Sequence, residues 1–166
     1  MKLIPLSQNS KALAGKHFAK VDDEDYDELI KYRWSVLRGH KMRGEKYYAK
    51  REQRQIFMHR QIMGVYDKNI YVDHKDGDPL NNQRSNLRLA TNSQNQANIG
   101  PRKDKKYKGT TKTKSGKFTT IISVLGKIKH LGSFDTEEDA AKAYDKAAFE
   151  AHGEFAYLNF PELLTN

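Results

Sequence analysis

Residues 72–98 read VDHKDGDPLNNQRSNLRLATNSQNQAN, and this stretch decides the fold of the first half of the chain. Strand-forming residues lead into an Asp-His pair, so the pattern predicts a short strand that ends there. Turn formers fill 75–79, and apolar and polar residues alternate over 86–90. Thr91 then fits the first position of a helical capping box. The stretch therefore predicts strand, loop, strand and helix in that order.

The polar residues of this stretch suit hydrolytic chemistry. Asp73 offers a carboxylate and Asn95 an amide oxygen, and two such ligands with water and phosphate are how proteins commonly hold magnesium. His74 points to the opposite face of the strand and titrates near pH ~6.5, which suits a general base. Asn86 could orient this histidine. From the residues alone, structural hydrogen bonding among Asn-rich turns explains the pattern equally well.

The stretch resembles the HNH motif of ββα-metal nucleases, as found in phage and intron-encoded homing endonucleases. Asp73 and His74 match the metal ligand and general base of the first strand. Asn86, in SNLR, matches the asparagine that braces the base, and Asn95, in SQNQAN, matches the helix ligand. The resemblance implies one divalent metal and hydrolysis of a DNA phosphodiester, with Asn98 as a weaker candidate ligand.

The expected cofactor is therefore one Mg²⁺, with Mn²⁺ as an alternative. The chain has no cysteine, which excludes disulfides and a thiolate zinc site, so no zinc is expected. Thirty Lys and Arg against 21 Asp and Glu give a net charge of +9, which favours an anionic partner such as DNA. No apolar run approaches the ~20 residues of a membrane span, and no signal-peptide core is recognisable, so we expect an intracellular protein of a bacterial or phage-infected cell.

The rest of the first half shows weaker patterns. Charged first-turn residues after Asp22 favour a helix start. The patterns predict a loose arm over 1–15, a strand over 17–21, a helix from Asp22 to Trp34, strands over 34–37 and 46–51, and a helix over 55–63. The basic turn over 38–44 suits either phosphate contact or a solvated hairpin tip.

Three further residues are candidates for supporting the site. His59 shares a predicted helical face with Ile56 and Met63, which is typical of a packed core histidine. The segment MHRQIMG nevertheless resembles a recurrent feature of phage HNH proteins, so His59 or Arg60 could support the site or contact the scissile phosphate. Arg88 is a similar candidate, since its strand faces the DNA in that family.

The composition changes after Asn98. Residues 100–117 hold eight Lys and Arg and one acid, and Gly100-Pro101 breaks the helix. Such a run is either a solvated tail or a segment that follows a phosphate backbone, and we favour the second. Its candidate DNA-binding residues are Arg102, Lys103, Lys105, Lys106, Lys108, Lys112, Lys114 and Lys117.

A regular pattern returns from residue 107. Strands are predicted over 107–112, 117–124 and 129–134, with turns at 114–116 and 125–127. In the middle strand Phe118, Thr120, Ile122 and Val124 suit a buried face, and the alternate residues suit an exposed one. Thr136 then caps a helix that ends at Gly153. Its predicted packing stripe is Ala140, Tyr144, Ala147, Ala148 and Ala151.

This second half resembles the Apetala-two (ethylene-response-factor) DNA-binding domain of plants, over YKGTTKTKSGKF and LGSFDTEEDAAKAYDKAAFEAHGEFAYLNFP. The resemblance implies that the exposed sheet face reads the major groove. It turns Lys108, Lys112, Lys117, Thr119, Ile121, Ser123 and Lys129 toward DNA. Plant members often carry arginine or glutamate where this chain has Thr111, Thr113, Ile121 and Ser123, so their target sequence does not carry over. His130 takes the place of a frequent aromatic residue and suits packing or phosphate contact.

The predicted fold class is α+β, with a ββα-metal HNH nuclease domain and a three-stranded antiparallel sheet packed on one helix. The predicted domains are 1–99, a basic linker over 100–106, 107–161 and a tail over 162–166. The predicted function is a homing-type endonuclease that nicks double-stranded DNA as a monomer rather than a homodimer. The alternatives are a DNA-binding regulator with a degenerate nuclease domain and, less favoured, a nuclease directed at RNA or at unusual structures.

Overall fold

The computed structural model describes residues 1–7, 17–39, 46–51, 56–124 and 126–164, and it divides the chain into two compact units. The first unit is Met1–Thr91 and the second is Asn92–Asn166. Both combine small antiparallel sheets with short helices, so the fold class is α+β. The units divide ahead of the boundary expected after residue 99, because the helix that follows Thr91 makes its contacts within the second unit.

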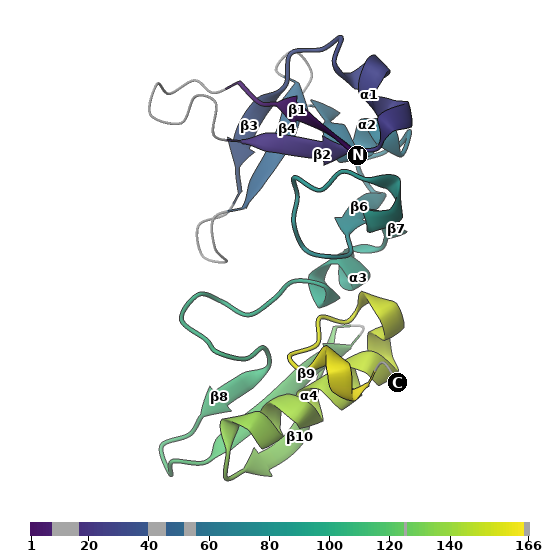
Figure 1. Ribbon diagram of the computed structural model, residues 1–166. Coiled ribbons are helices and arrows are strands. Elements are labelled where there is room, and N and C mark those ends of the chain that lie inside the picture. Colours follow the sequence, from purple (N-terminus) through teal and green to yellow (C-terminus); the bar gives the residue numbers. More distant parts are fainter. Residues whose placement is uncertain (8–16, 40–45, 52–55, 125, 165–166) are drawn as a thin grey trace. The chain divides into compact units, whose positions relative to one another are not determined.

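The N-terminus forms a strand, so the prediction of a loose arm is wrong for its first residues. β1 (Lys2–Pro5) pairs antiparallel with β2 (Phe18–Val21), as Figure 1 shows. Ile4 and Leu6 are buried in the core of this unit, which holds the segment in place. The later part of the predicted arm lies outside the described residues.

Helix α1 (Asp23–Leu29) begins where predicted and ends five residues earlier than predicted. The indole Nε1 of Trp34 donates to the carbonyl of Leu29 at 2.8 Å, so the tryptophan side chain satisfies a carbonyl at the helix end. Trp34 itself is buried in the core. Asp22 takes the N-cap position, but its carboxylate accepts hydrogen bonds from Gln83 and Arg84 instead of capping the helix.

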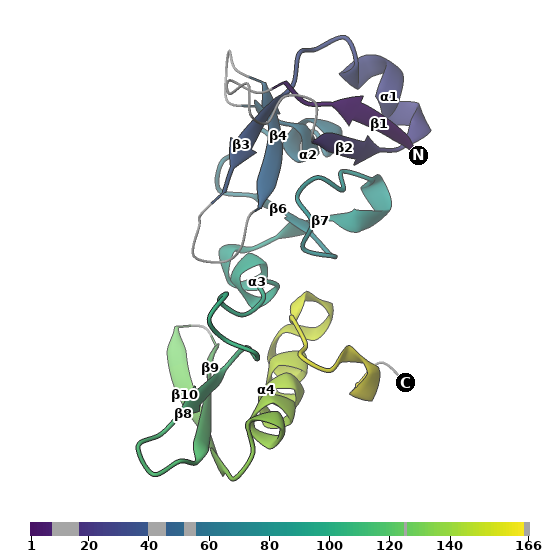
Figure 2. The ribbon, with the colours of Figure 1, turned by 60° about the vertical axis from the view of Figure 1, so that its left-hand side comes forward.

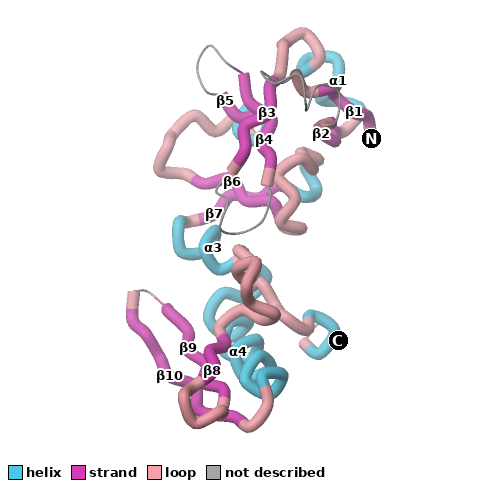
Figure 3. The backbone as a smooth tube through the Cα atoms, turned by 90° about the vertical axis from the view of Figure 1, so that its left-hand side faces the viewer, coloured by secondary structure: helices cyan, strands magenta, loops and turns pink. Residues whose placement is uncertain are grey.

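A second sheet has the order β3-β4-β5 (Figure 3). Its strands are β3 (Ser35–Arg38), β4 (Tyr47–Arg51) and β5 (Ile56–Phe57). Helix α2 (Met58–Ile62) follows directly, so the helix predicted over 55–63 is wrong at its start. Ile56 and Phe57 extend because they pair with β4. Most of the basic turn predicted over 38–44 lies outside the described residues.

The stretch that opened the sequence analysis folds as a two-stranded hairpin. β6 (Tyr71–His74) pairs antiparallel with β7 (Leu87–Ala90), and a 3-10 turn, η1 (Arg84–Asn86), leads into β7. The register places Asp73 opposite Arg88. The two predicted strands are confirmed, with Asn86 just ahead of the second one.

One core holds the first unit together. It is built from residues of nearly every element of this unit, so the hairpin is anchored to the rest of the unit by burial of Val72 and Leu87. The largest buried apolar side chains are Trp34, Met58, Ile4 and Val21.

The second unit opens with α3 (Asn92–Ala97) and continues as a three-stranded antiparallel sheet of order β10-β9-β8 with one long helix along it (Figure 2). The strands are β8 (Thr110–Lys112), β9 (Phe118–Val124) and β10 (Lys127–Phe134), the helix is α4 (Glu137–His152), and two 3-10 turns follow, η2 (Gly153–Phe155) and η3 (Pro161–Leu163).

Small residues on α4 let the helix and the sheet approach closely. Ala140, Tyr144 and Ala148 are buried as predicted, but Ala151 is exposed, and Ala141 is buried without having been predicted. Gly109 has φ +84°, and a Cβ there would lie 2.0 Å from the ring of Tyr144. Only glycine fits at this contact.

Candidate functional site

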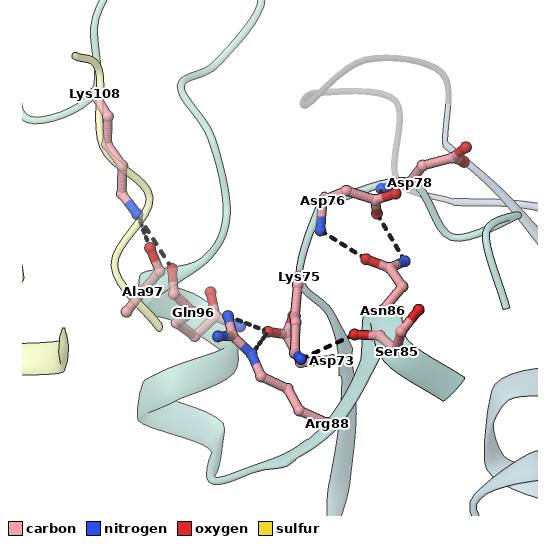
Figure 4. Close-up of polar contacts among 10 residues, drawn as sticks. All are labelled: Asp73, Lys75, Asp76, Asp78, Ser85, Asn86, Arg88, Gln96, Ala97 and Lys108. Carbon is pink, nitrogen blue, oxygen red and sulfur yellow. Dashed lines mark hydrogen bonds and ion pairs between the residues drawn. The ribbon is translucent and has the colours of Figure 1, made fainter. Parts of the chain in front are cut away.

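Asp73 and Arg88 form a buried ion pair across the hairpin. They are directly opposite in the antiparallel register, so their side chains leave the sheet on the same face. Arg88 Nε donates to Asp73 Oδ2 at 2.9 Å, and Nη2 lies 2.9 Å from the same oxygen (Figure 4). The Arg88 side chain is only 10% exposed and that of Asp73 only 7%, so the two charges pair with each other in a place that is largely shielded from water.

His74 is buried next to Asp73, at the end of β6. Its Nε2 lies 3.5 Å from the side-chain oxygen of Asn82, which is fully buried and anchored through its amide to the carbonyl of Pro79. Burial lowers the pKa of His74, against the opposing effects of Asn82 and of the nearby carboxylate of Asp76. The imidazole is therefore held neutral at ordinary pH. Sequence reasoning missed Asn82, and its only signal was the Asn-Asn dipeptide in the loop.

Asn86 fixes the loop that follows His74. Its amide nitrogen donates to Asp76 and to the carbonyl of Asn81, and its oxygen accepts from the backbone N–H of Asp76. Burial tends to raise the pKa of Asp76, but hydrogen bonds from Asn81, the Asp78 backbone and Asn86 outweigh it, so the pKa is lowered. The direct brace on the imidazole expected of Asn86 stays a prediction, while the described contacts link Asn86 to the loop.

His59 lies against the imidazole of His74. The two ring centroids are 5.0 Å apart with the rings at 73°, an edge-to-face contact. Burial lowers the pKa of His59 to about 3, with further lowering by His74 and Arg60. Its buried Nδ1 has no hydrogen-bond partner among the residues the structure describes. Its packing is that of a core histidine, and its position beside His74 also suits support of the site.

Arg60 is engaged within its own unit. Its guanidinium donates to the carbonyls of Ile70 and Asp67, at 2.8 and 2.6 Å. These bonds hold the loop that leads into β6. The arginine thus has a structural task, and contact with a phosphate stays a prediction.

Asn95 and Asn98 belong to the second unit. Asn95 lies in α3, and the backbone N–H of Asn98 continues the helical ladder by donating to Gln94. The carbonyl of Ala97, at the end of the helix, accepts from the backbone N–H of Tyr157. It also accepts from Lys108 Nζ, as Figure 4 shows. Lys108, predicted to face DNA, therefore holds the end of α3.

The Asp73 carboxylate is a hard oxygen ligand of the kind that suits a divalent cation. No group of three or more His, Cys, Asp and Glu side chains that could hold a metal occurs among the described residues. Asn95, the second expected ligand, belongs to the second unit, so its part in a metal site stays a prediction. The ion pair with Arg88 shows that the Asp73 carboxylate already attracts positive charge in a buried place.

The outer face of the second unit's sheet is largely uncharged. Ile121 and Ser123 are exposed as predicted, and the register puts His130 and Ile128 directly opposite them on the same face. His130 is exposed, so it does not pack in the core. Lys129, by contrast, pairs with buried Ile122 and leaves β10 on the other side. Ile128 is 74% exposed, and sequence reasoning did not include it in this face.

The basic residues around this sheet divide into two groups. Lys106 and Lys117 pair with Glu138 and Asp135, and Lys112 lies over the ring of Phe118. The exposed basic remainder of the predicted DNA-binding set is Arg102, Lys103, Lys105, Lys114 and Lys129.

Comparison with known proteins gives the class first. A family model described as HNH endonuclease matches residues 54–97, which include the hairpin and α3. An uncharacterized HNH endonuclease of Acanthamoeba polyphaga mimivirus is 34% identical over 143 residues, covering 86% of this chain and 74% of that protein. Protein 3.8 of Escherichia phage T7 is 32% identical over 114 residues, covering 67% of this chain and 93% of that protein. The chain belongs to the HNH endonuclease family.

A second relationship accompanies the first. An ethylene-responsive transcription factor of Arabidopsis thaliana is 46% identical over 65 residues, which cover 38% of this chain and 35% of that protein. The chain thus spans about a third of the length of that plant protein, and it combines HNH and ethylene-response-factor-like sequence. A comparison with solved structures gave no match. Among the described residues, no helix is long and apolar enough to cross a membrane.

Proposed function

We propose that this chain is a metal-dependent endonuclease of homing type that hydrolyses a phosphodiester bond in double-stranded DNA. The observation that carries the proposal is the buried Asp73-His74 pair at the end of β6, inside the segment matched by the HNH family model. A histidine that activates water must be held in a fixed position, and the metal that assists it needs a carboxylate ligand nearby. His74 is buried in a fixed position and Asp73 is adjacent to it.

In this proposal His74 takes a proton from water. The amide oxygen of Asn82 can only accept, so a hydrogen bond with Nε2 of His74 requires the proton to be on Nε2. The low pKa of the buried ring keeps it neutral and ready to accept that proton. Asn86 orients His74 through the loop it holds.

Asp73 and Asn95 would hold one Mg²⁺ or Mn²⁺, with Asn98 as a weaker candidate. The ion, when bound, offsets negative charge on the phosphate and the leaving oxygen. The residues of the chain bind and position it, and His59 keeps the imidazole in place by packing against it.

The second unit binds DNA in this proposal, through the outer sheet face and the exposed basic residues. Tethering a second DNA-binding module raises the effective concentration of the nuclease at its site. A monomer has one such site, so nicking of one strand is the expected product.

The test is cleavage of supercoiled plasmid with Mg²⁺, with and without chelator. His74→Ala should abolish nicking while DNA affinity stays within about twofold, because the variant removes the base and no phosphate contact. His17→Ala is the matched control, because the His17 ring packs against Tyr47 and has no role in the proposed chemistry, so the variant should leave cleavage intact. Equal cleavage by His74→Ala and the parent would remove His74 as the base.

The similarity to plant transcription factors favours one alternative, a DNA-binding regulator with an inactive nuclease unit. This alternative predicts tight duplex binding and no nicking at any Mg²⁺ or Mn²⁺ concentration. The same plasmid assay therefore separates the two functions.

A further inference from the structure

The pair between Asp73 and Arg88 raises the question of what the arginine does when a metal is present. A carboxylate that is 7% exposed needs a compensating positive charge, since an unpaired buried charge is strongly unfavourable. Arg88 supplies that charge in the structure, with two guanidinium nitrogens 2.9 Å from one carboxylate oxygen. Figure 4 shows this pair across the hairpin.

A divalent ion bound by Asp73 would change this balance. With such an ion bound, Asp73 would no longer need Arg88 as its counter-charge, and the guanidinium would be repelled by the neighbouring positive charge. Arginine is weakly hydrated, always charged and shaped to bind a phosphate through two parallel hydrogen bonds. A guanidinium released from Asp73 is therefore suited to a DNA phosphate, and the strand that carries it begins directly after the hairpin loop, where Leu87 pairs with His74.

We infer that Arg88 is the resident counter-ion of Asp73, that a divalent metal competes with it for this carboxylate, and that DNA relieves the competition by binding the guanidinium. The inference rests on the proposed function. It makes metal and DNA binding mutually reinforcing: each ligand raises affinity for the other by the same factor, as linkage requires. A metal ion would then be held firmly only when DNA is present.

The simpler reading is a structural ion pair that stays closed throughout. In that reading loss of Arg88 leaves Asp73 uncompensated and loosens the hairpin, and the effect on Mn²⁺ affinity does not depend on DNA. The two readings differ in what loss of Arg88 does to metal affinity without DNA: the inference expects tighter metal binding and the structural reading does not. They also differ in how strongly metal binding and DNA binding should affect each other.

The experiment measures Mn²⁺ affinity by calorimetry in the full chain, with and without a saturating short duplex. All proteins carry His74→Ala, which prevents turnover, so the readout is binding and not activity. In this parent, duplex DNA should raise Mn²⁺ affinity about tenfold or more, within the usual range of coupling between two ligands. Adding Arg88→Gln should raise Mn²⁺ affinity several-fold without DNA and reduce the coupling to about twofold or less.

Arg88→Lys keeps the charge and removes the planar fork, so it guards against a folding defect of the glutamine variant. Without DNA its Mn²⁺ affinity should stay within about twofold of the parent, and its coupling to DNA should be clearly smaller. Fluorescence of Trp34, buried in the same unit, reports that each variant is folded. Arg84→Gln is a matched control, since Arg84 pairs with Glu24 and Asp25 of α1 and the proposed site gives it no role, so it should leave the coupling unchanged.

Two results would overturn the inference by itself: Mn²⁺ binding by the parent with no effect of DNA, or the same coupling in Arg88→Gln and Arg88→Lys as in the parent. Weaker Mn²⁺ binding by folded Arg88→Gln without DNA would also overturn it and assign a structural role. Absence of Mn²⁺ binding by every protein, with or without DNA, would overturn the proposed function as well.

Discussion

Asp145 is the most informative residue to remove from the second unit. It lies on α4 and is 2% exposed. Its carboxylate accepts hydrogen bonds from the backbone of Asn159 at 2.9 Å, the side chain of Asn159 at 2.8 Å and the backbone of Phe160 at 2.7 Å. These bonds fix the segment after η2 on the helix.

The cost of Asp145→Ala follows from these contacts. Hydrogen bonds to a charged group contribute about 1.5–3 kcal/mol each, and they are not additive when they share one carboxylate. Two backbone N–H groups and one amide would lose their acceptor in a largely buried place. We expect a loss of about 3 kcal/mol or more in the free energy of unfolding of the second unit, a large part of the total stability of a domain this small.

Two optical signals separate the units in a urea titration. Trp34 is the only tryptophan of the chain and lies in the first unit, whereas far-UV circular dichroism at 222 nm is dominated by α4, the longest helix described. Asp145→Ala should move the circular dichroism midpoint down by more than about 1 M, given slopes of about 1–3 kcal/mol per M. The Trp34 midpoint should stay where it is. Glu150→Ala, an exposed acid on the same helix, is the matched control.

The same variant tests a route from α4 to α3. Asn159, held by Asp145, bonds to both backbone groups of residue 108, and the Lys108 side chain binds the end of α3. Faster amide exchange in α3 should therefore accompany the loss of stability. A circular dichroism midpoint within about 0.3 M of the parent would refute the reasoning, because it would mean that the carboxylate contributes less than one ordinary hydrogen bond.

Three more predictions concern other parts of the chain. Lowering the pH from 7.5 to 5 should reduce the free energy of unfolding of the first unit by about 2 kcal/mol, measured by Trp34 fluorescence in urea. The cause is that His59 has a pKa of about 3 in the folded state against 6.5 in the unfolded state, so the unfolded chain takes up the proton first. His59→Phe should lose most of this pH dependence. Asp22→Ala should lower the free energy of unfolding of the first unit by about 1 kcal/mol, because it removes the hydrogen bonds from Gln83 and Arg84. An unchanged urea midpoint of the Trp34 signal would show that these bonds make no net contribution to stability. Lys108→Met should speed amide hydrogen exchange at the end of α3 about tenfold, because it removes the ammonium that binds the Ala97 carbonyl. Lys112→Met should not change this exchange, because the Lys112 ammonium lies over the ring of Phe118 instead.

The parts of the fold that sequence predicts well are those whose signal is local. The alternation in β9 fixes which side chains face α4, and the strands of the hairpin follow from short apolar runs between turn formers. The failures have distant causes. β1 exists because it pairs with β2 across a long loop, α1 stops because the Trp34 indole binds Leu29, and residues 56–57 extend because β4 is beside them.

The candidate site shows the same division. Asp73 and His74 are identifiable because an acid and a histidine close a strand, and their burial agrees with that choice. The partner of His74, Asn82, and the partner of Asp73, Arg88, depend on loop geometry and strand register, which local patterns do not specify. Which residues share the exposed face of the sheet depends on register too, so Ile128 was missed, and Lys129 pairs with buried Ile122.

Helix α3 is where sequence and structure divide the chain differently. The family match runs to Ala97 and counts the helix with the nuclease motif, but its last carbonyls are bound by Lys108 and Tyr157, which lie beyond that match. A helix of six residues is too short to be stable by itself, so these contacts matter for its persistence. The helix that carries Asn95 thus depends on residues of the second unit. The ethylene-response-factor-like half therefore supports the helix at which the HNH family match ends.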